Sequence, residues 1–584
     1  MNNYFFPEKN IKFFSFLYKN DHNFVFKENF QIKEVFKNKT FINEDLYNQQ
    51  DHSEICIKSF KIAKKIKLSN YFSKNKLLNE VLKKKLVINI EEILRISFLF
   101  EKIKTHYSLK NLYLCKLFYD LELFYYLKKK NYISKEIKIS KTYLYASKFL
   151  SSCVNIYLLL NLIFLPEKIF FLCRKNSNKK KYFAVFNFDT LPNFNDNNGY
   201  MSLLNKINKP SIFIKELKMN ESFFYKKDYN RNLQNVLFIS DVFKNISLLS
   251  YFLNFYKKYF FERLKLIFSF NQNYKEKYRY FSNKICWEVF FHCFQVKKCL
   301  TAMQPCDLTS QIIQKKNSKE TIFFYLSSTY CCLKNENDND YVSHIQYNQM
   351  NYSSLITNEV STNFLNKKSN NFDNFLKFKP ATISLNSNSK RNILLFRRKF
   401  NLENKKIIAI FDNSFGYKGI LTNNEYINFL KYLNFLIKKY KNYFFILIKK
   451  KRTASYSSNI YNSKELNSEL NKMKNFKNFI NFNDQLTTSE VIYLSDIILT
   501  NPNSSIINES FSLKKTTAIF DNIKINFSDK LYSKINNKIN INNIKYRNRL
   551  LDKDILNLLK MNSKKIININ KDKNVSDLIN YLND

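Results

Sequence analysis

The stretch SDIILTNPNSSIINESFSLKKTTAIFD, residues 495–521, carries the clearest fold signal in the chain. Its apolar run DIILT (496–500) predicts a buried strand, and the turn NPNSS follows directly. The pattern SIINESF (505–511) predicts a short helix, and TTAIFD (516–521) predicts the next strand. A strand, a turn, a helix and a second strand in this order form one unit of a parallel α/β sheet.

The residues before this stretch repeat the same alternation. Further strands are predicted at KIIAIFD (406–412), YFFILIKK (443–450) and FINF (479–482), and helices at 424–440, 463–474 and 487–495. Residues 386–525 are therefore predicted to form a doubly wound sheet, on which ligands bind outside the carboxyl ends of the strands. The polar stretch 386–406 that precedes the first of these strands is interpreted as an interdomain linker.

A second α/β domain is predicted over residues 176–385. Its strands are expected at 182–188, 211–217, 235–240, 298–304 and 321–327, and a long helix is expected from Asp241 to Phe268, capped by Ser240 and Asp241. Residues 1–175 are predicted to be a mainly helical accessory region, and residues 526–584 a C-terminal helical tail. The expected fold class is thus α/β, with two Rossmann-like doubly wound domains preceded by a helical region.

The composition narrows the classes of function. The 584 residues include 96 Lys and Arg against 48 Asp and Glu, a net charge of +48, and only 11 of the basic residues are Arg. Abundant Lys, Asn, Ile, Phe and Tyr are typical of an AT-rich genome, so codon bias accounts for much of this charge. The lysines are spread over the whole chain without an Arg-rich block, so nucleic acid is not the expected partner. A basic RNA-binding protein of an AT-rich organelle or endosymbiont genome is kept as the alternative.

The cysteine, histidine and hydropathy patterns indicate whether the chain has a metal site, a signal peptide or a membrane span. The 10 Cys and five His form no CxxC or HExxH motif, so free thiols and no metal are expected. The N-terminus lacks the apolar core of a signal peptide, which favours a cytoplasmic location. The uncharged segment 149–166 is at the lower limit of spanning length, so a buried or interfacial helix is favoured, and the protein is expected to be cytoplasmic or peripheral to the cytoplasmic membrane.

The turn and helix after residue 500 are the first candidate site. Ser504 and Ser505 lie where the predicted helix begins, so their hydroxyls and the free backbone N–H groups could bind an anion without glycine. Glu509 lies one turn further on, in a position to accept hydrogen bonds from two sugar hydroxyls. The alternative is structural: Ser504 caps the helix and Glu509 is a favourable first-turn carboxylate.

Two more clusters follow predicted strands of the same sheet. After strand 406–412, the loop holds two of the three glycines in the chain, Gly416 and Gly419, which suggests a sharp turn or a close approach to a ligand. Asp412, Ser414 and Lys418 are the candidate ligand-facing residues there; an ordinary turn is the alternative. After strand 443–450 come Lys449 and Arg452, of which Arg452 is the better candidate because a guanidinium can bind a phosphate through two hydrogen bonds.

The pattern S-D-I-I-L-T-x-P-x-S-S-x-x-x-E-S resembles the nucleotide-sugar half of GT-B glycosyltransferases. It is closer still to polysaccharide-biosynthesis proteins named for a Pro-Phe-Thr-Ser signature, and more distantly similar to CDP-glycerol glycerophosphotransferases. The signature here is Pro502-Asn503-Ser504-Ser505, in which Pro and the final Ser match, Ser replaces Thr and Asn replaces Phe. The resemblance covers residues 400–525 well, and residues 180–400 by strand–helix order alone.

The resemblance implies an enzyme that transfers a sugar or polyol phosphate from a nucleotide-activated donor to a glycan or lipid-linked acceptor. It implies no separate cofactor and no metal, and it places the donor in the second α/β domain. One carboxylate or His would deprotonate the acceptor. Asp189, directly after strand 182–188, is the first candidate and Asp241, after strand 235–240, the second; the alternative for each is a helix cap or loop carboxylate. A non-catalytic assembly protein of the same fold is a further alternative.

Overall fold

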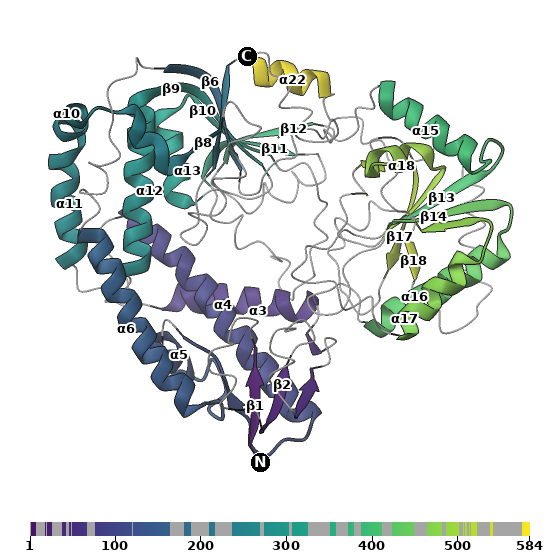
Figure 1. Ribbon diagram of the computed structural model, residues 1–584, viewed down its shortest axis with the longest axis horizontal. Coiled ribbons are helices and arrows are strands. Elements are labelled where there is room, and N and C mark those ends of the chain that lie inside the picture. Colours follow the sequence, from purple (N-terminus) through teal and green to yellow (C-terminus); the bar gives the residue numbers. More distant parts are fainter. Residues whose placement is uncertain are drawn as a thin grey trace.

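The structure is a computed structural model in which three parallel sheets carry helices on their faces (Figure 1). It describes residues 2–7, 18, 20–25, 38–42, 46–47, 49–66, 76–118, 121–163, 180–188, 210–215, 236–268, 274–302, 307–324, 351–357, 372–378, 387–411, 423–448, 464–481, 486–500, 506, 509–510, 513, 515–521, 538–540 and 575–584.

The sheet predicted within residues 386–525 is present, with one further strand, β18, that was not predicted and lies in the segment 526–584 expected to be a helical tail. Its strands run parallel in the order β15-β14-β13-β16-β17-β18. The strands are β13 (Lys406–Phe411), β14 (Tyr443–Ile448), β15 (Phe479–Asn481), β16 (Ile497–Thr500), β17 (Thr516–Asp521) and β18 (Lys538–Asn540). The helices are α15 (Ser387–Lys399), α16 (Asn423–Lys439), α17 (Lys464–Lys474) and α18 (Thr488–Leu494).

Successive side chains of β13 pack into two hydrophobic clusters, one on each face of the sheet. Ile408 and Ile410 pack with residues of α16 and α17, whereas Ile407 and Ala409 pack with residues of α15 and α18. Successive side chains of a strand point to opposite faces, and here both faces are covered. The continuous apolar run KIIAIF follows from this double burial.

The interpretation of residues 386–406 as a linker is wrong, because residues 387–399 form helix α15. Ile393 and Phe396, one turn apart, pack into the core beside β13. The Arg397 guanidinium donates to the Leu494 carbonyl at the end of α18, at 3.2 Å. The segment was interpreted as a linker because the exposed side of this helix carries many charged residues, which make the composition of the segment polar.

The second predicted sheet is also present and is larger than predicted. Its strands run parallel in the order β12-β11-β10-β9-β6-β7-β8. The strands are β6 (Lys180–Phe188), β7 (Ser211–Lys215), β8 (Val236–Phe238), β9 (Phe294–Ala302), β10 (Glu320–Phe324), β11 (Tyr352–Thr357) and β12 (Phe372–Lys377). The first five match predicted strands, whereas β11 and β12 were not predicted.

Helices connect these strands and cover the sheet. They are the 3₁₀ helix η3 (Ile239–Asn245), α10 (Leu248–Tyr251), the π-helical η4 (Phe252–Tyr256), α11 (Lys257–Phe268), α12 (Tyr274–Cys293) and α13 (Leu308–Asn317). The predicted cap at Ser240 and Asp241 is wrong: the α-helix begins at Leu248, and the Ser247 hydroxyl caps it by accepting from Ser250 N–H at 3.1 Å. Residues 239–245 form the 3₁₀ helix instead.

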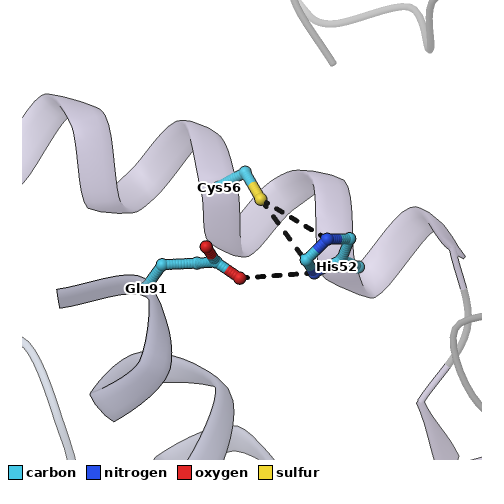
Figure 2. Close-up of side chains that lie close together, drawn as sticks. All are labelled: His52, Cys56 and Glu91. Carbon is cyan, nitrogen blue, oxygen red and sulfur yellow. Dashed lines mark hydrogen bonds and ion pairs between the residues drawn. The ribbon is translucent and has the colours of Figure 1, made fainter. Parts of the chain in front are cut away.

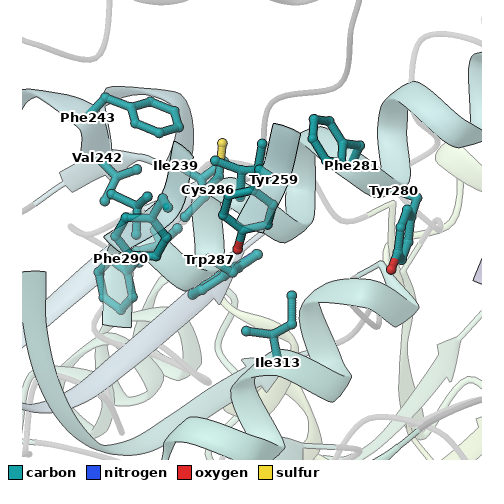
Figure 3. Close-up of a cluster of buried hydrophobic side chains, with 14 of the residues drawn as sticks. Ile239, Val242, Phe243, Tyr259, Tyr280, Phe281, Cys286, Trp287, Phe290 and Ile313 are labelled. Atoms are coloured by element: carbon teal, nitrogen blue, oxygen red, sulfur yellow. The ribbon is translucent and has the colours of Figure 1, made fainter. Parts of the chain in front are cut away.

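The core of this second unit is built around α12. Trp287, the one tryptophan in the chain, is fully buried there beside Phe290. Figure 3 shows both rings with Tyr259 of α11 and Ile313 of α13. Three helices thus share one apolar cluster, which ties them to the sheet.

The N-terminal region holds a further parallel sheet, which was not predicted. In chain order it is the first sheet, the sheet of β6 to β12 is the second, and the sheet of β13 to β18 is the third. Its strands are short and run in the order β3-β2-β1-β4-β5. They are β1 (Asn3–Phe6), β2 (His22–Val25), β3 (Lys39–Phe41), β4 (Tyr113–Leu114) and β5 (Lys138–Ile139). The helices of this region are α3 (Gln49–Lys65), α4 (Lys76–His106), α5 (Leu121–Lys129) and α6 (Lys141–Ile163), so the region combines a sheet with helices.

The C-terminal helix α22 (Val575–Asn583) packs against the second sheet rather than the third. Leu578 and Leu582 are fully buried in a cluster with residues of β6, β9 and β10. The Lys298 ammonium of β9 donates to the Tyr581 carbonyl at 2.6 Å. Figure 1 shows α22 above these strands, so α22 belongs to the second unit although it follows the third sheet in the sequence.

The uncharged segment 149–166 falls largely within α6. Among the described residues, no helix combines the length and the apolar character needed to cross a membrane. The described part of this segment, 149–163, is helical.

Candidate functional site

The third sheet reverses its strand order between β13 and β16. From β13 the chain adds β14 and β15 on one side, and then crosses to the other side to add β16, β17 and β18. In open parallel sheets, ligands bind outside the carboxyl ends of the strands at such a switch point. The candidate site is therefore the edge where β13 and β16 end.

The strand register aligns three carboxyl ends at this edge. Phe411 of β13 pairs with Ile448 of β14 on one side and with Thr500 of β16 on the other. The residues that directly follow these strand ends are Asp412, Lys449 and Asn501. The three strand ends that precede the segments singled out in the sequence thus lie side by side.

Most of the predicted site residues lie outside the described residues, and their roles stay predictions. They are Asp412, Ser414, Gly416, Lys418, Lys449, Arg452, Ser504 and Ser505.

Glu509 belongs to the described residues. It is helical, its side chain is 6% exposed, and its carbonyl accepts from Leu513 N–H at 3.2 Å. A carboxylate removed from water in this way is stable only when other groups hydrogen-bond to it. The role of Glu509, as a ligand of sugar hydroxyls or as a structural carboxylate, stays a prediction.

Ser510, next to Glu509, anchors this helical turn to the sheet, and sequence reasoning missed it. The Thr517 hydroxyl of β17 donates to the Ser510 hydroxyl at 2.8 Å, and both side chains are buried. The Lys515 ammonium donates to the carbonyls of Tyr493 and Ser495, at 2.7 and 2.8 Å. Burial lowers the pKa of Lys515. Two hydroxyl residues and one lysine within a polar run carry no sequence signal that separates anchoring residues from surface ones.

The second sheet has its own switch point, between β6 and β9. Asp189 follows the end of β6 at Phe188 directly, but it lies outside the described residues. Asp241 is described: it lies in η3 after β8, and its Oδ1 is 3.3 Å from the Lys244 ammonium. Because β8 is the edge strand, Asp241 begins two strands away from the switch point. The topology thus favours the position of Asp189 over that of Asp241.

The N-terminal sheet switches between β1 and β4, but aromatic side chains fill this edge. Phe6 at the end of β1 packs with Tyr18, Cys115 and Tyr143, all of them buried. The Tyr18 and Ser140 hydroxyls are hydrogen-bonded to each other. Burial raises the pKa of the Cys115 thiol well above its usual range. This edge is a packed core rather than an open ligand site.

Comparisons with known proteins give structural likenesses only. No protein-family model matches the chain, and no curated protein is similar to it. Similar solved structures include the N-terminal domain of Candida albicans trehalose-6-phosphate phosphatase, at 10% identity and a TM-score of 0.36, covering 70% of this chain and 94% of that one. The wall teichoic acid polymerase TagF is similar at 12% identity and a TM-score of 0.34, with 74% and 97% covered. MnaA of S. aureus with UDP is similar at 11% identity and a TM-score of 0.33, with 60% and 80% covered.

These three structures are similar to the chain at 10–12% identity and TM-scores of 0.33–0.36. Their identities and TM-scores are low, so the fold of this chain is defined by its own strand orders and registers. Those define an α/β protein with two large Rossmann-like doubly wound sheets, the class expected from the sequence.

Proposed function

We propose that this protein is a glycosyltransferase-like enzyme of surface polysaccharide synthesis. It transfers a sugar or a polyol phosphate from a nucleotide-activated donor to a glycan or lipid-linked acceptor. The observation that carries the proposal is the coincidence of the motif with the topology: β16 ends at Thr500, at the switch point of the third sheet, and the P-N-S-S signature begins two residues later in the sequence.

The proposed roles follow from charge and position. Ser504 and Ser505 at a helix N-terminus, with Lys449 and Arg452 after the neighbouring strand, bind the donor phosphates. Glu509 accepts hydrogen bonds from two donor hydroxyls. The helix dipole and the basic side chains stabilise the negative charge on the leaving group.

The acceptor side is assigned to the second sheet. Asp189, after the central strand β6, is the proposed base that removes the acceptor proton as the new bond forms. The proposed location is the cytoplasm, at the surface of the cytoplasmic membrane, where a lipid-linked acceptor is available.

The donor site is tested by calorimetry with UDP, CDP and GDP on the full chain. Ser505→Ala and Glu509→Gln should weaken binding, and for Glu509→Gln the loss should be about 1.5–3 kcal/mol because a charged hydrogen-bonding group is removed. Glu403→Gln is the matched control, since Glu403 is exposed in the turn before β13. Unchanged nucleotide affinity in both site variants would show that the donor site lies elsewhere.

The RNA-binding alternative predicts a different response. Its affinity for single-stranded RNA must fall with salt at a log–log slope of about −0.7 per phosphate contacted. Under the transferase proposal, any RNA binding is non-specific and unaffected by Ser505→Ala or Glu509→Gln. Sequence-selective sub-micromolar RNA binding at physiological salt, without any response to sugar nucleotides, would favour the alternative. Donor binding without any transferred product would favour the non-catalytic assembly protein.

A further inference from the structure

Helix α6 presents an apolar stripe to solvent. Exposed positions along it recur every three or four residues and include Phe149, Ile156 and Leu160, which are 73%, 59% and 46% exposed. A helix of a globular protein normally turns such a stripe toward the core. The helix contains no acidic residue, and its Lys148 is exposed next to Phe149.

The helical run α10–η4–α11 also presents apolar side chains to solvent. Leu249, Leu253 and Phe268 are 68%, 70% and 75% exposed. The run also has two aromatic ladders with a spacing of four residues. Tyr251, Phe255 and Tyr259 face the core, whereas Phe252, Tyr256 and Phe260 stack on one another on the adjacent side.

The two helical segments touch each other. The Arg263 guanidinium of α11 donates to the Ile163 carbonyl at the end of α6, at 2.9 Å. Both lie along the left edge of the molecule in Figure 1. We define the exposed apolar residues of α6 and of residues 248–268 as the apolar face. Its exposed lysines include Lys148, Lys257 and Lys265.

We propose that the apolar face docks on an anionic lipid bilayer. The leucine and aromatic side chains can insert into the apolar part of the bilayer. The lysines beside them can bind the negatively charged headgroups. Exposed apolar side chains that gather on two helical segments in contact mark an interaction site. This proposal rests on the proposed function, because docking on the bilayer would give the enzyme access to a lipid-linked acceptor.

Vesicle flotation of the full chain tests the proposal without donor or acceptor. The protein should float with vesicles of phosphatidylcholine and phosphatidylglycerol, and less with phosphatidylcholine alone. Leu249→Ser with Leu253→Ser should lower the partition at least about tenfold, since each leucine loses its apolar burial in the lipid. Leu394→Ser with Leu395→Ser on α15 is the matched control, because both leucines are more than half exposed there.

Three results would overturn the proposal. One is equal flotation of the double variant and the control. Another is no flotation of the unsubstituted chain with anionic vesicles. The third is a dimer in light scattering that dissociates in the Leu249→Ser, Leu253→Ser variant, which would assign the face to a second copy of the chain. Nucleotide affinity is measured separately, so failure here leaves the donor site unaffected.

A second, independent observation concerns helices α3 and α4. His52 and Cys56 lie one turn apart on α3, and Glu91 comes from α4 beside it (Figure 2). His52 Nδ1 is 3.7 Å from Glu91 Oε1 and 4.0 Å from Cys56 Sγ. One ligand atom from each residue lies within 4.8 Å of the others. Among the described residues, this is the grouping of His, Cys and acidic side chains that could hold a metal ion.

We infer that these three residues form a zinc site. Zinc prefers thiolate, imidazole and carboxylate ligands at about 2.0–2.3 Å, which places tetrahedral ligand atoms roughly 3.3–3.6 Å apart. The observed spacings need only small side-chain rotations to reach these values. Three protein ligands leave a fourth position for water. Binding releases the Cys56 thiol proton and replaces the 2.9 Å hydrogen bond between the Tyr47 hydroxyl and Nδ1.

Metal analysis of the full chain tests the site. After incubation with Zn²⁺ and dialysis, one equivalent should be retained, and Co²⁺ should give a thiolate-to-cobalt charge-transfer band. Cys56→Ser should abolish that band, and His52→Ala and Glu91→Gln should weaken Zn²⁺ binding at least about tenfold. Cys153→Ser and His106→Ala are matched controls, since both residues are exposed. Equal zinc retention by the ligand variants and the controls, or none by the unsubstituted chain, would overturn the inference.

Discussion

At the scale of single residues, burial separates inert thiols from reactive ones. Cys299 of β9 is fully buried, and desolvation raises the pKa of its thiol to about 12. Cys153 on α6 is exposed. Because the thiolate is the nucleophile, native iodoacetamide treatment at pH 8 should label Cys153 and leave Cys299 unmodified until the chain unfolds. Peptide mass spectrometry checks this, and equal labelling of the two residues would contradict the burial of Cys299.

A second residue-scale prediction concerns Lys277 of α12. Its side chain is buried, and desolvation lowers its pKa to about 8, below the value of about 10.4 in unfolded chains. The unfolded state therefore holds the proton between these values, so stability rises with pH from about 8 to 10. Lys277→Met should remove this rise. Urea denaturation midpoints across this pH range measure it, and parallel profiles for both proteins would refute the prediction.

Only the strand ends that border the candidate site could be predicted from the sequence; the side-chain contacts around it could not. Phe411, Ile448 and Thr500 end apolar runs in the sequence, so the edge where they meet follows from the strand pattern. The Ser510–Thr517 hydrogen bond joins two polar residues whose partnership depends on how the helical turn packs on β17. No spacing rule identifies such a pair in advance.

At the scale of elements, helix α18 positions the strand that ends at the candidate site. Its Thr487 hydroxyl accepts from Glu490 N–H at 3.3 Å, and the Glu490 carboxylate accepts from Thr487 N–H at 2.7 Å, which is a capping box. Thr487→Ala should destabilise this unit by about 1 kcal/mol. Thr487→Ser is the control, because it keeps the cap hydroxyl. Hydrogen exchange of β16 amides reports the loss, and equal exchange in both variants would show that the cap contributes little.

The elements that the sequence pattern did not reveal share a physical cause. The strands β1 to β5 have two to four residues, too few for an alternating pattern to emerge, and their pairing joins residues far apart, such as Tyr4 with Tyr113. Helix α15 was missed for a different reason. Two buried residues one turn apart, Ile393 and Phe396, hold it against the sheet while charged residues dominate its composition.

At the scale of the whole molecule, the three sheets repeat one topology. In each, the first strand is central, the next two are added on one side and the later ones on the other. The N-terminal copy has a switch point filled by aromatic rings around Phe6 and Tyr18, whereas the switch points of the other two are followed directly by Asp189 and by the motif after Thr500. The first unit is thus predicted to be structural at this edge.

The packing of α22 gives a prediction for the assembled chain. Leu578→Ala and Leu582→Ala should each destabilise the second unit by about 2–5 kcal/mol, because each side chain is fully buried. Leu394→Ala, at a leucine that is 56% exposed, should have little effect. Limited proteolysis of the second unit measures the difference. Resistance equal to that of the control would mean that α22 does not stabilise the sheet.

The return of α22 to the second sheet also has a consequence for biosynthesis. About 200 residues, including the whole third sheet, are translated after β12 and before α22, which takes roughly 10–40 s at ordinary rates. During that interval Ala184, Phe186 and Ile322 lack their C-terminal cover. The second unit can complete its core only after α22 has left the ribosome. A nonsense mutation between β12 and α22 therefore produces a chain in which this apolar face of the second sheet stays exposed. Chaperones and proteases recognise such exposed apolar surface, so these truncated chains should be degraded.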